Sequence, residues 1–361
     1  MFGISMKSML LLPVALRLTL AQTSSSTIAC NNSPDLCGRA YNNITHLGAH
    51  DSPFVRDEST DYTLSGNQYY NSTVQLSAGA RLLSAQVQTN STSGQLSVCH
   101  TSCSLLNAGT LSSWLREVNA WLMSNANEVV TILLVNGAGA SAADIAAEYD
   151  AAGISSSEVY TPVASSANQT WPTLQQMISN GTRLVNFVAT LTDNAAAPYL
   201  MNEFDYIFEN SYENFAPTDF SCTANRPGSV ANNTSGALAT GLMPLMNHFL
   251  YEQQAFDIEI PNEDLISTTN APSGGVGSLG SSATQCTTEY GRLPTFLLVD
   301  FFNVGPSINT ADRLNGVTAP VGRTVVSTAV VNASTSSAMM SIGLQHSMLC
   351  LTILAVGSTL A

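Results

Sequence analysis

The feature that most constrains the fold is an alternation of short apolar runs with helical patterns, which continues from residue 30 to residue 325 without a long linker. Apolar runs of this length are typical of strands that are buried on both faces of a parallel sheet. Six of them are interpreted as strands: Ile44–Ala49, Ala80–Val87, Val129–Val135, Arg183–Ala189, Tyr206–Phe208 and Thr295–Phe301. The alternation predicts an α/β protein with a single TIM-type (β/α)8 barrel, regular or irregular, over residues 30–325.

Two segments between the predicted strands have clear local patterns. The first is a helix capped by Thr110, because its apolar residues fall on one helical face: Leu111, Trp114, Leu115, Val118, Trp121 and Leu122. The second, Ser267–Thr287, is rich in Gly and Ser, and we expect a long loop held by Cys286.

Both ends of the chain carry targeting patterns. Residues 1–21 combine Lys7, an apolar run and small residues, as a secretory signal peptide does. Residues 326–361 contain a Ser/Thr-rich stretch, a short spacer and an apolar tail, which is the order of a GPI-anchor signal. The tail is shorter than the roughly 20 residues of a transmembrane helix. We expect a secreted protein, GPI-anchored at the outer leaflet of the cell surface or at the cell wall; the alternative is an unprocessed apolar C-terminus.

The cysteines suit an oxidising compartment. Six of the seven lie outside the apolar tail, an even number that permits three disulfides. Proximity in the sequence favours the pairs Cys30–Cys37, Cys99–Cys103 and Cys222–Cys286. A zinc site is the weaker interpretation, because no Cys-x-x-Cys pair or histidine cluster accompanies them.

The surface is expected to be glycosylated and poor in cations. Nine Asn-x-Ser/Thr sequons are present: Asn31, Asn43, Asn71, Asn90, Asn168, Asn180, Asn232, Asn233 and Asn332. Lys7 is the only lysine, and the formal net charge is -14. Such a surface cannot neutralise a run of phosphates, so nucleic acid and strongly anionic bilayers are unfavourable partners.

Polar side chains follow several of the predicted strands. His50 and Asp51 follow the first strand, Gln86 ends the second, and His100 follows a further short strand that begins at Gln95. Two more follow later strands: Asn136 and Asp300. The C-terminal strand ends of a barrel share one rim, where barrel enzymes carry their chemistry. Two histidines on such a rim suit a general base and a general acid, whereas a lone histidine is more often structural.

The order of these motifs resembles the X-domain barrel of phosphatidylinositol-specific phospholipases C, and most of all its secreted fungal branch. The resemblance rests on His-Asp-Ser at 50–52, Gly-Ala-Arg-Leu-Leu at 79–83, Cys-His-Thr-Ser-Cys at 99–103 and Asn-Glu-Val-Val-Thr at 127–131. It covers residues 30–315 and is most specific over 46–135.

The resemblance implies a role for each motif residue. His50 would be the general base that deprotonates the inositol 2-hydroxyl, and His100 the general acid that protonates the leaving diacylglycerol oxygen. Asp300 would orient His50, with Asp51 beside them, and Tyr212 would stack on the inositol ring. An internal hydroxyl nucleophile makes an enzyme nucleophile unnecessary. No Gly-x-Ser-x-Gly elbow is present, which argues against a serine hydrolase.

The chain departs from the family pattern on its second strand. Where bacterial members have an Asp-x-Arg pair whose arginine contacts the phosphate, this chain has Ser84 and Gln86. Gln86 and Asn136 would then face the phosphate. The acids of metal-dependent members are also missing, so we expect no metal and no other cofactor. Two interpretations remain open. One is a phosphodiesterase acting on phosphatidylinositol-like or glycerophosphodiester substrates, and the other is a catalytically weak barrel that binds a sugar or lipid head group.

Overall fold

The computed structural model describes residues 28–164, 166–254 and 258–331. The predicted signal peptide, residues 332–361 of the predicted anchor segment and the sequon at Asn332 lie outside these residues. None of the described helices is long and apolar enough to cross a bilayer.

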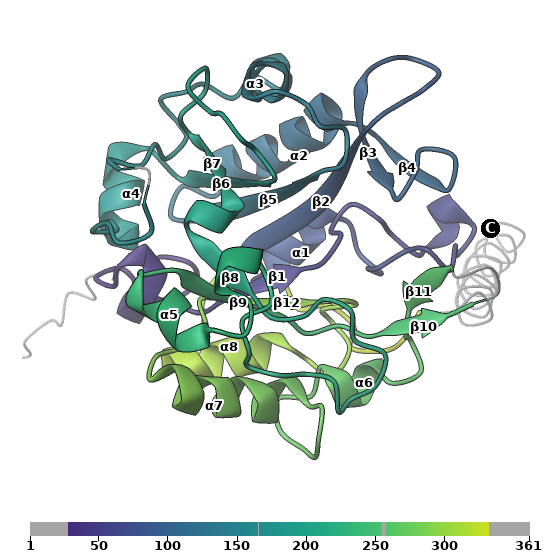
Figure 1. The fold of residues 1–361 in the computed structure, drawn as a ribbon, viewed down its shortest axis with the longest axis vertical. Coiled ribbons are helices and arrows are strands. Elements are labelled where there is room, and N and C mark those ends of the chain that lie inside the picture. Colours follow the sequence, from purple (N-terminus) through teal and green to yellow (C-terminus); the bar gives the residue numbers. More distant parts are fainter. Residues whose placement is uncertain (1–27, 165, 255–257, 332–361) are drawn as a thin grey trace, which may run out of the picture.

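Eight parallel strands form a curled sheet at the centre of the molecule (Figure 1). In chain order they are β1 (His46–Ala49), β2 (Leu82–Thr89), β5 (Val130–Asn136), β6 (Leu184–Ala189), β7 (Leu200–Asn202), β8 (Ile207–Glu209), β9 (Met243–Asn247) and β12 (Phe296–Val299). Each strand except β7 pairs with the next in this order, and β12 pairs with β1. Within the described residues no ladder joins β7 to β8. The predicted TIM-type barrel is therefore confirmed in its irregular form, with one open seam.

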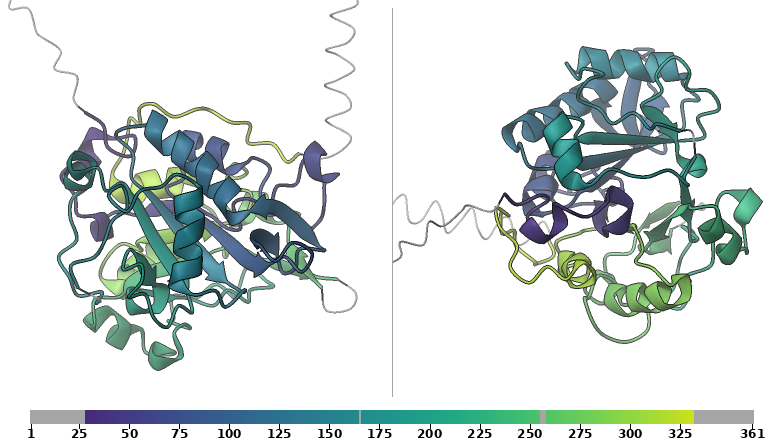
Figure 2. Two further views of the ribbon diagram at one scale, coloured as in Figure 1. Left: turned by 90° about the horizontal axis from the view of Figure 1, so that it is seen from above. Right: turned by 90° about the vertical axis from the view of Figure 1, so that its left-hand side faces the viewer.

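Helices cover the sheet on two sides (Figure 2). One group is α1 (Ser72–Ala78), α2 (Leu111–Ser124) and α3 (Ala142–Ala151), and the opposite group includes α7 (Leu279–Tyr290) and α8 (Ile308–Asn315). The shorter helices are α4 (Leu174–Asn180), α5 (Thr234–Ala239) and α6 (Ile266–Thr269). Single 3-10 turns occur at Pro34–Leu36, Tyr41–Asn43, Glu58–Thr60, Glu203–Asp205 and Gly228–Val230.

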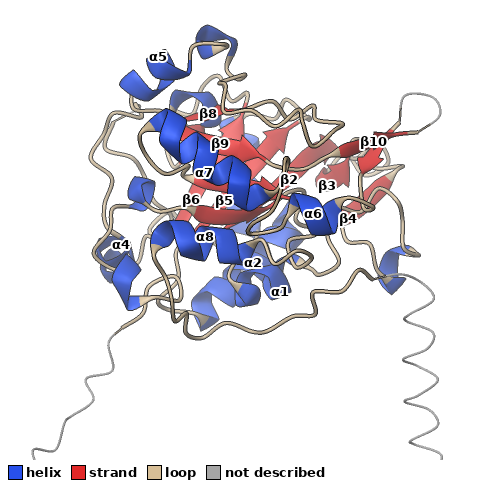
Figure 3. Ribbon diagram, turned by 90° about the horizontal axis from the view of Figure 1, so that it is seen from below, coloured by secondary structure: helices blue, strands red, loops and turns tan. Residues whose placement is uncertain are grey.

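Two antiparallel hairpins lie on the same side of the barrel, opposite α4 (Figure 3). The first is β3 (Leu96–His100) with β4 (Leu106–Thr110), and β3 also pairs antiparallel with the end of β2. The second is β10 (Tyr251–Gln253) with β11 (Glu259–Pro261). These hairpins extend the barrel at one end.

The six predicted strands are confirmed, with ends shifted by a few residues, and two strands of the parallel sheet were missed. β9 contains Pro244, a residue that argues against a central strand because it lacks a backbone N–H. β7 has only three residues, too few to show a periodic pattern.

The predicted helix over 111–122 is confirmed as α2. The Thr110 side chain accepts a hydrogen bond from the backbone N–H of Ser113, as an N-cap does. Its two tryptophans lie against α1, and their indole N–H groups donate to Ser72 and Ser77. Because both N–H groups are hydrogen-bonded within the protein, we interpret both rings as part of the core packing.

The expectation of a loop over 267–287 is wrong, because this segment contains α6 and most of α7. Four residues of α7 form one buried face: Leu279, Ala283, Cys286 and Tyr290. Hydroxyls in α7 bond back to carbonyls four residues earlier, for example Thr287 to Ala283. Gly280 packs so closely that an added Cβ would lie 1.8 Å from the carbonyl oxygen of Pro272. Gly280 reflects this close packing, whereas Gly274, Gly275 and Gly277 lie in the short loop between α6 and α7.

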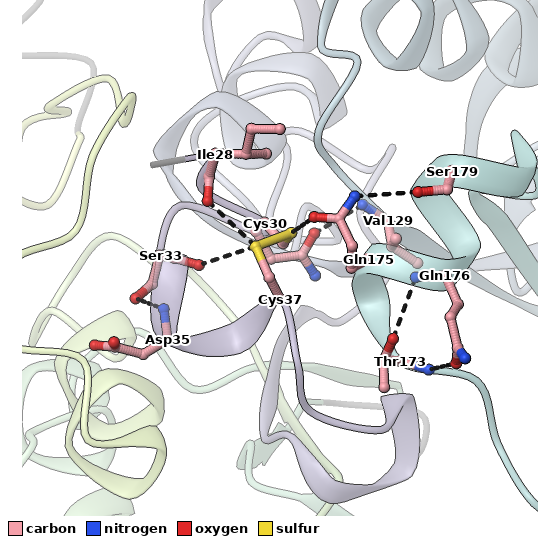
Figure 4. Close-up of a disulfide and its surroundings, with 11 residues drawn as sticks. Ile28, Cys30, Ser33, Asp35, Cys37, Val129, Thr173, Gln175, Gln176 and Ser179 are labelled. Atoms are coloured by element: carbon pink, nitrogen blue, oxygen red, sulfur yellow. Dashed lines mark hydrogen bonds between the residues drawn. A yellow bond between two sulfur atoms is a disulfide. The ribbon is translucent and has the colours of Figure 1, made fainter. Parts of the chain in front are cut away.

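The structure contains disulfides at all three predicted pairs, Cys30–Cys37, Cys99–Cys103 and Cys222–Cys286. The first lies against the N-terminal turn of α4, beside Gln175 (Figure 4). In that turn Thr173 and Gln176 form a capping box, in which each side chain bonds to the other residue's backbone N–H. The third disulfide joins α7 to the segment that follows β8.

Aromatic rings fill the barrel near the N-terminal ends of its strands. Trp171 stacks on Tyr41 with ring centroids 5.0 Å apart, and it also contacts Phe187 and Tyr206. The Tyr41 hydroxyl shares a hydrogen bond with Thr131 on β5. This end of the barrel is therefore a packed core, which leaves the opposite end for polar chemistry.

Candidate active site

His50 and Asp300 are neighbours because their strands are neighbours. His50 follows β1 and Asp300 follows β12, two strands that pair in parallel along their whole length. The backbone N–H of His50 donates to the carbonyl of Val299, so the ladder continues to the first residue after each strand. His50 Nδ1 lies 2.9 Å from Asp300 Oδ1. This contact fixes the ring so that its Nε2 faces the barrel mouth.

A set of amides and one aromatic ring hold this pair in place. Asn67 donates to Asp300 Oδ1 at 3.0 Å, and Gln68 donates to the carbonyl of His50 at 2.8 Å. The Phe249 ring stacks on the His50 ring, with centroids 3.8 Å apart and planes 4° from parallel. Contacts on three sides therefore restrict the rotation of His50.

Asp51 lies between the two histidines. Its carboxylate is buried, and its Oδ2 atom is 3.7 Å from His50 Nε2 and 3.5 Å from His100 Nε2. The two ring nitrogens are therefore no more than about 7 Å apart, close enough to flank one phosphate group. Asp51 adopts a left-handed backbone, with φ of 45°, and its N–H donates to the Ser84 hydroxyl.

His100 reaches the site by a route that the sequence did not predict. It is the last residue of β3, which runs antiparallel to β2 instead of extending the parallel sheet. β2 continues beyond the rim, and the chain turns and returns along it, which brings His100 back to the mouth. The Cys99–Cys103 disulfide brackets His100, and the Phe54 ring meets the imidazole edge-on at 5.2 Å.

Gln86 connects the two halves of the site. Its Nε2 donates to Asp51 Oδ2 at 2.7 Å, and its Oε1 accepts from the backbone N–H of Thr101 at 2.8 Å. Both ends of the amide are thus engaged within the protein. This placement indicates that Gln86 fixes Asp51 and the turn after His100.

Asn136 and Tyr212, the other two predicted substrate contacts, occupy different surroundings. Both polar atoms of the Asn136 side chain bond to the backbone of Ala140 and close a local turn. Asn136 lines a separate hollow of 310 Å³ beside Thr190 and Asp193. Tyr212 lies under the guanidinium of Arg226, whose central carbon is 4.3 Å from the ring centroid.

Sequence reasoning missed a charged cluster at the ends of β8 and β9. Glu209 Oε2 accepts from Arg226 Nε at 2.8 Å and from Asn247 at 3.0 Å. Glu203 is also buried beside Glu209. Glu209 and Asn247 are the last residues of parallel strands, so the rule that located Asn136 could have found them once β9 was recognised.

The charges shift the pKa values of the two histidines in opposite directions. Burial lowers the pKa of His50, but the negative charges of Asp51 and Asp300 outweigh it and raise the pKa above its usual value. Burial lowers the pKa of His100, and the nearby His50 lowers it further. In the free protein the proton therefore resides preferentially on His50.

Two other groups at the site are held neutral. Burial, followed by the charge of Glu209, raises the pKa of Glu203 well above its usual value. Burial also raises the pKa of the Tyr251 hydroxyl well above its usual value, and Asp300 and Asp51 add to the shift. Tyr251 meets the Phe249 ring edge-on, so its ring extends the wall that begins at His50.

Asp51 and Asp300 already have partners within the protein. Asp51 Oδ2 accepts a hydrogen bond from Gln86 and faces two imidazoles, and Asp300 pairs with His50. Among the described residues no group of three or more His, Cys, Asp or Glu side chains is arranged to hold a metal ion. Turnover without metal remains a prediction.

The barrel with an open seam and paired histidines on its C-terminal rim places the chain in a known class. The PI-PLC X family model (PI-PLC X 1) matches residues 36–315, and the protein belongs to this family. The fold agrees with that of a phosphatidylinositol-specific phospholipase C from Listeria monocytogenes, with a TM-score of 0.50, 16% sequence identity, and coverage of 78% of this chain and 95% of that one.

Two fungal relatives are more similar in sequence. A PI-PLC X domain-containing protein 1 from Arthroderma benhamiae is 35% identical over 82% of this chain and 92% of its own length. A protein of the same organism described only as an uncharacterized secreted protein is 38% identical over 81% of this chain. The match spans 65% of that relative's length.

Proposed function

We propose that the protein is a phosphoric diester hydrolase or lyase that cleaves phosphatidylinositol-like or glycerophosphodiester substrates by general acid–base catalysis. The observation that carries the proposal is the arrangement of His50 and His100 on either side of Asp51 Oδ2. The family and the names of its relatives support a phosphodiester with a phosphatidylinositol head group as the substrate class.

In this proposal His50 acts as the base. Asp300 accepts a hydrogen bond from the Nδ1–H of His50. Nε2 then carries no proton and can remove one from a substrate hydroxyl next to the phosphate. That hydroxyl oxygen attacks the phosphorus and forms a cyclic phosphate, and the bond from phosphorus to the leaving-group oxygen breaks. His100 donates its Nε2 proton to that oxygen, so no free alkoxide has to form. Such proton transfers typically accelerate reactions about 10²- to 10⁴-fold each.

The reaction requires the proton to move from His50 to His100 when substrate binds. A phosphodiester carries a negative charge, and an anion beside His100 raises the pKa of its imidazole. The proton that resides on His50 in the free protein can then be held by His100 instead. Asp51, in contact with both Nε2 atoms, stabilises the cation on either ring.

Arg226 is our candidate for the cation that strand two lacks. Its side chain is 38% exposed, and the guanidinium contacts Glu209 through Nε and one terminal nitrogen. The other terminal nitrogen has no hydrogen-bond partner among the described residues. A guanidinium at the rim can supply the charge-assisted contact that a neutral Gln86 does not.

A catalytically weak barrel that binds a sugar or lipid head group is the second candidate. It is favoured by Gln86, whose amide is engaged by Asp51 and Thr101 and replaces the arginine of the bacterial pattern. In that case Arg226 and Tyr212 would bind the head group, and no bond of the ligand would be cleaved.

Secretion and a GPI anchor are also part of the proposal. The segments that suggest them, residues 1–21 and 326–361, extend outside the described part of the chain. The name of one relative supports secretion. An anchored enzyme would meet its substrate at the outer leaflet.

The test is the release of a cyclic phosphate from phosphatidylinositol vesicles by the purified protein, followed by phosphorus NMR. The His100→Ala variant serves as the control, and its unfolding temperature verifies that it is folded. Release by the wild type and its loss in the variant would support the enzyme. Vesicle binding without release would favour the second candidate.

A further inference from the structure

A hollow of 690 Å³ is lined in part by Gln176 and Asn180 of α4. Figures 1 and 3 show α4 on the side of the barrel opposite to the two hairpins. The hollow lies beside the N-terminal end of β6, where Val159 pairs with Leu184. Its lining combines Ser, Thr, Asn and Gln side chains with two aromatic rings, two valines and a proline, and it contains no charged residue. The size falls within the range of about 300 to 1,000 Å³ that small-ligand sites occupy. These properties suit an uncharged ligand rich in hydroxyls.

Trp171 and Tyr160 form the aromatic part of the lining. Trp171 is 3% exposed, and its indole N–H has no hydrogen-bond partner among the described residues. The other two tryptophans, Trp114 and Trp121, donate to serine hydroxyls. A buried indole N–H without an acceptor is unfavourable. The nitrogen itself is enclosed by protein atoms, so the hollow offers a ligand aromatic surface instead, and the ring of Tyr160 lies 5.4 Å from that of Trp171 between centroids.

A glycosylation sequon forms part of the same lining. Asn180 and Thr182, the first and third residues of the sequon, both line the hollow. Asn180 is exposed and ends α4, and Gly181 follows with a left-handed backbone, φ of 77°. The capping box and the Cys30–Cys37 disulfide hold the first turn of this helix in place (Figure 4). The attachment point is therefore accessible and fixed relative to the hollow.

We propose that Asn180 carries an N-linked glycan whose first sugars occupy this hollow. In the secretory pathway the amide Nδ2 of Asn180 would bond to the anomeric carbon of a lipid-pyrophosphate-linked oligosaccharide. Nδ2 loses one proton, and the lipid pyrophosphate leaves. The sugar hydroxyls then bond to the surrounding Ser and Thr side chains, while the sugar face packs over Tyr160. The glycan would complete the closed end of the barrel.

The experiment compares glycans on the intact protein secreted by a yeast host. Peptide mapping by mass spectrometry determines which sequons are occupied. An endoglycosidase that cuts between the first two sugars is then applied to the folded protein, and release is followed at each site. Asn90, in the exposed turn between β2 and β3, and Asn43, which is exposed and whose sequon lies outside the lining, are the matched controls.

We expect release at Asn180 to be about 3- to 10-fold slower than at the controls, the size expected for a contact with aromatic rings. Ser157→Trp, at an exposed lining position, should fill the hollow, displace the sugars and restore fast release. Ser156→Trp is the second such variant. The proposal is overturned if Asn180 is unmodified where a control site is modified. Equal release rates at all sites, or slow release that persists in both tryptophan variants, would also overturn it.

Discussion

Replacing Asp300 with asparagine isolates the charge that orients His50. The carboxylate is 2% exposed, and its Oδ1 accepts from both His50 and Asn67. Asparagine has nearly the same shape, so packing is preserved while the charge is lost. The amide can present an N–H to His50 Nδ1, which favours the tautomer whose proton is on Nε2. That tautomer cannot act as the base.

The effect on activity should be large. Substitution of the orienting carboxylate in a histidine-based site costs up to about 10⁴-fold in turnover, a value measured on serine proteases. We expect a loss of about 10²- to 10⁴-fold in kcat with little change in KM, because Asp300 contacts His50 and not the substrate. Initial rates on phosphatidylinositol vesicles measure it.

The effect on stability should depend on pH. Because the pKa of His50 is raised in the folded protein, its protonated form stabilises the fold. This contribution is complete below the unfolded value of 6.5 and is lost as the pH rises through the folded value. At about pH 5 Asp300→Asn therefore loses a hydrogen bond to a charged group, about 1.5 to 3 kcal/mol. At about pH 9 the difference in unfolding free energy should be smaller.

Urea unfolding at both pH values provides the check. The reasoning would be refuted if the variant retained wild-type kcat, or if its stability deficit were larger at the alkaline pH. An Asn67→Ala variant, which removes the second donor to Asp300 but no charge, is the matched comparison. It should lower stability by a similar amount at both pH values.

Four further predictions concern other parts of the molecule. Arg226→Lys, which keeps the charge opposite Glu209 but loses the planar fork, should raise KM for phosphatidylinositol several-fold; an unchanged KM would remove Arg226 from the substrate site. Cys99→Ser with Cys103→Ser should lower kcat more than the unfolding temperature, because a loop of four residues constrains the unfolded chain little and mainly orients His100. Because burial lowers the pKa of His46 and His248 to about 4, both bind protons only in the unfolded chain between pH 6.5 and about 4. The unfolding temperature should therefore fall as the pH falls through that window, and a flat profile would contradict this. Activity should survive EDTA, and loss on chelation with recovery on adding calcium would make Asp51 a ligand candidate.

The sequence predicted the barrel because its central strands are buried on both faces and read as continuous apolar runs. It failed where that signal is absent. β9 carries a proline, and β7 has three residues. α7 shows a composition of small residues that serves close packing against Pro272, as at Gly280. Each failure concerns packing between segments distant in the chain, which periodicity does not encode.

Positions at the ends of strands were predictable, but the directions of their side chains were not. Neighbouring parallel strands bring His50 and Asp300 together by topology alone. His100 reaches the rim because β3 runs back antiparallel along β2. Gln86 is held by a hydrogen bond from the backbone N–H of Thr101, a contact that the sequence does not indicate. The Glu209–Arg226 pair joins a strand end to a residue 17 positions later in a loop, a contact without a local sequence signal.

The most direct test of the central claim compares two substrates in two variants. If His100 is the acid, His100→Ala should be severely impaired on phosphatidylinositol but much less on an inositol phosphodiester whose leaving group is a nitrophenolate. Such a leaving group departs without a proton. His50→Ala should be equally impaired on both, because the attacking hydroxyl must still lose its proton. Equal impairment of His100→Ala on both substrates would contradict the assignment of His100 as the acid.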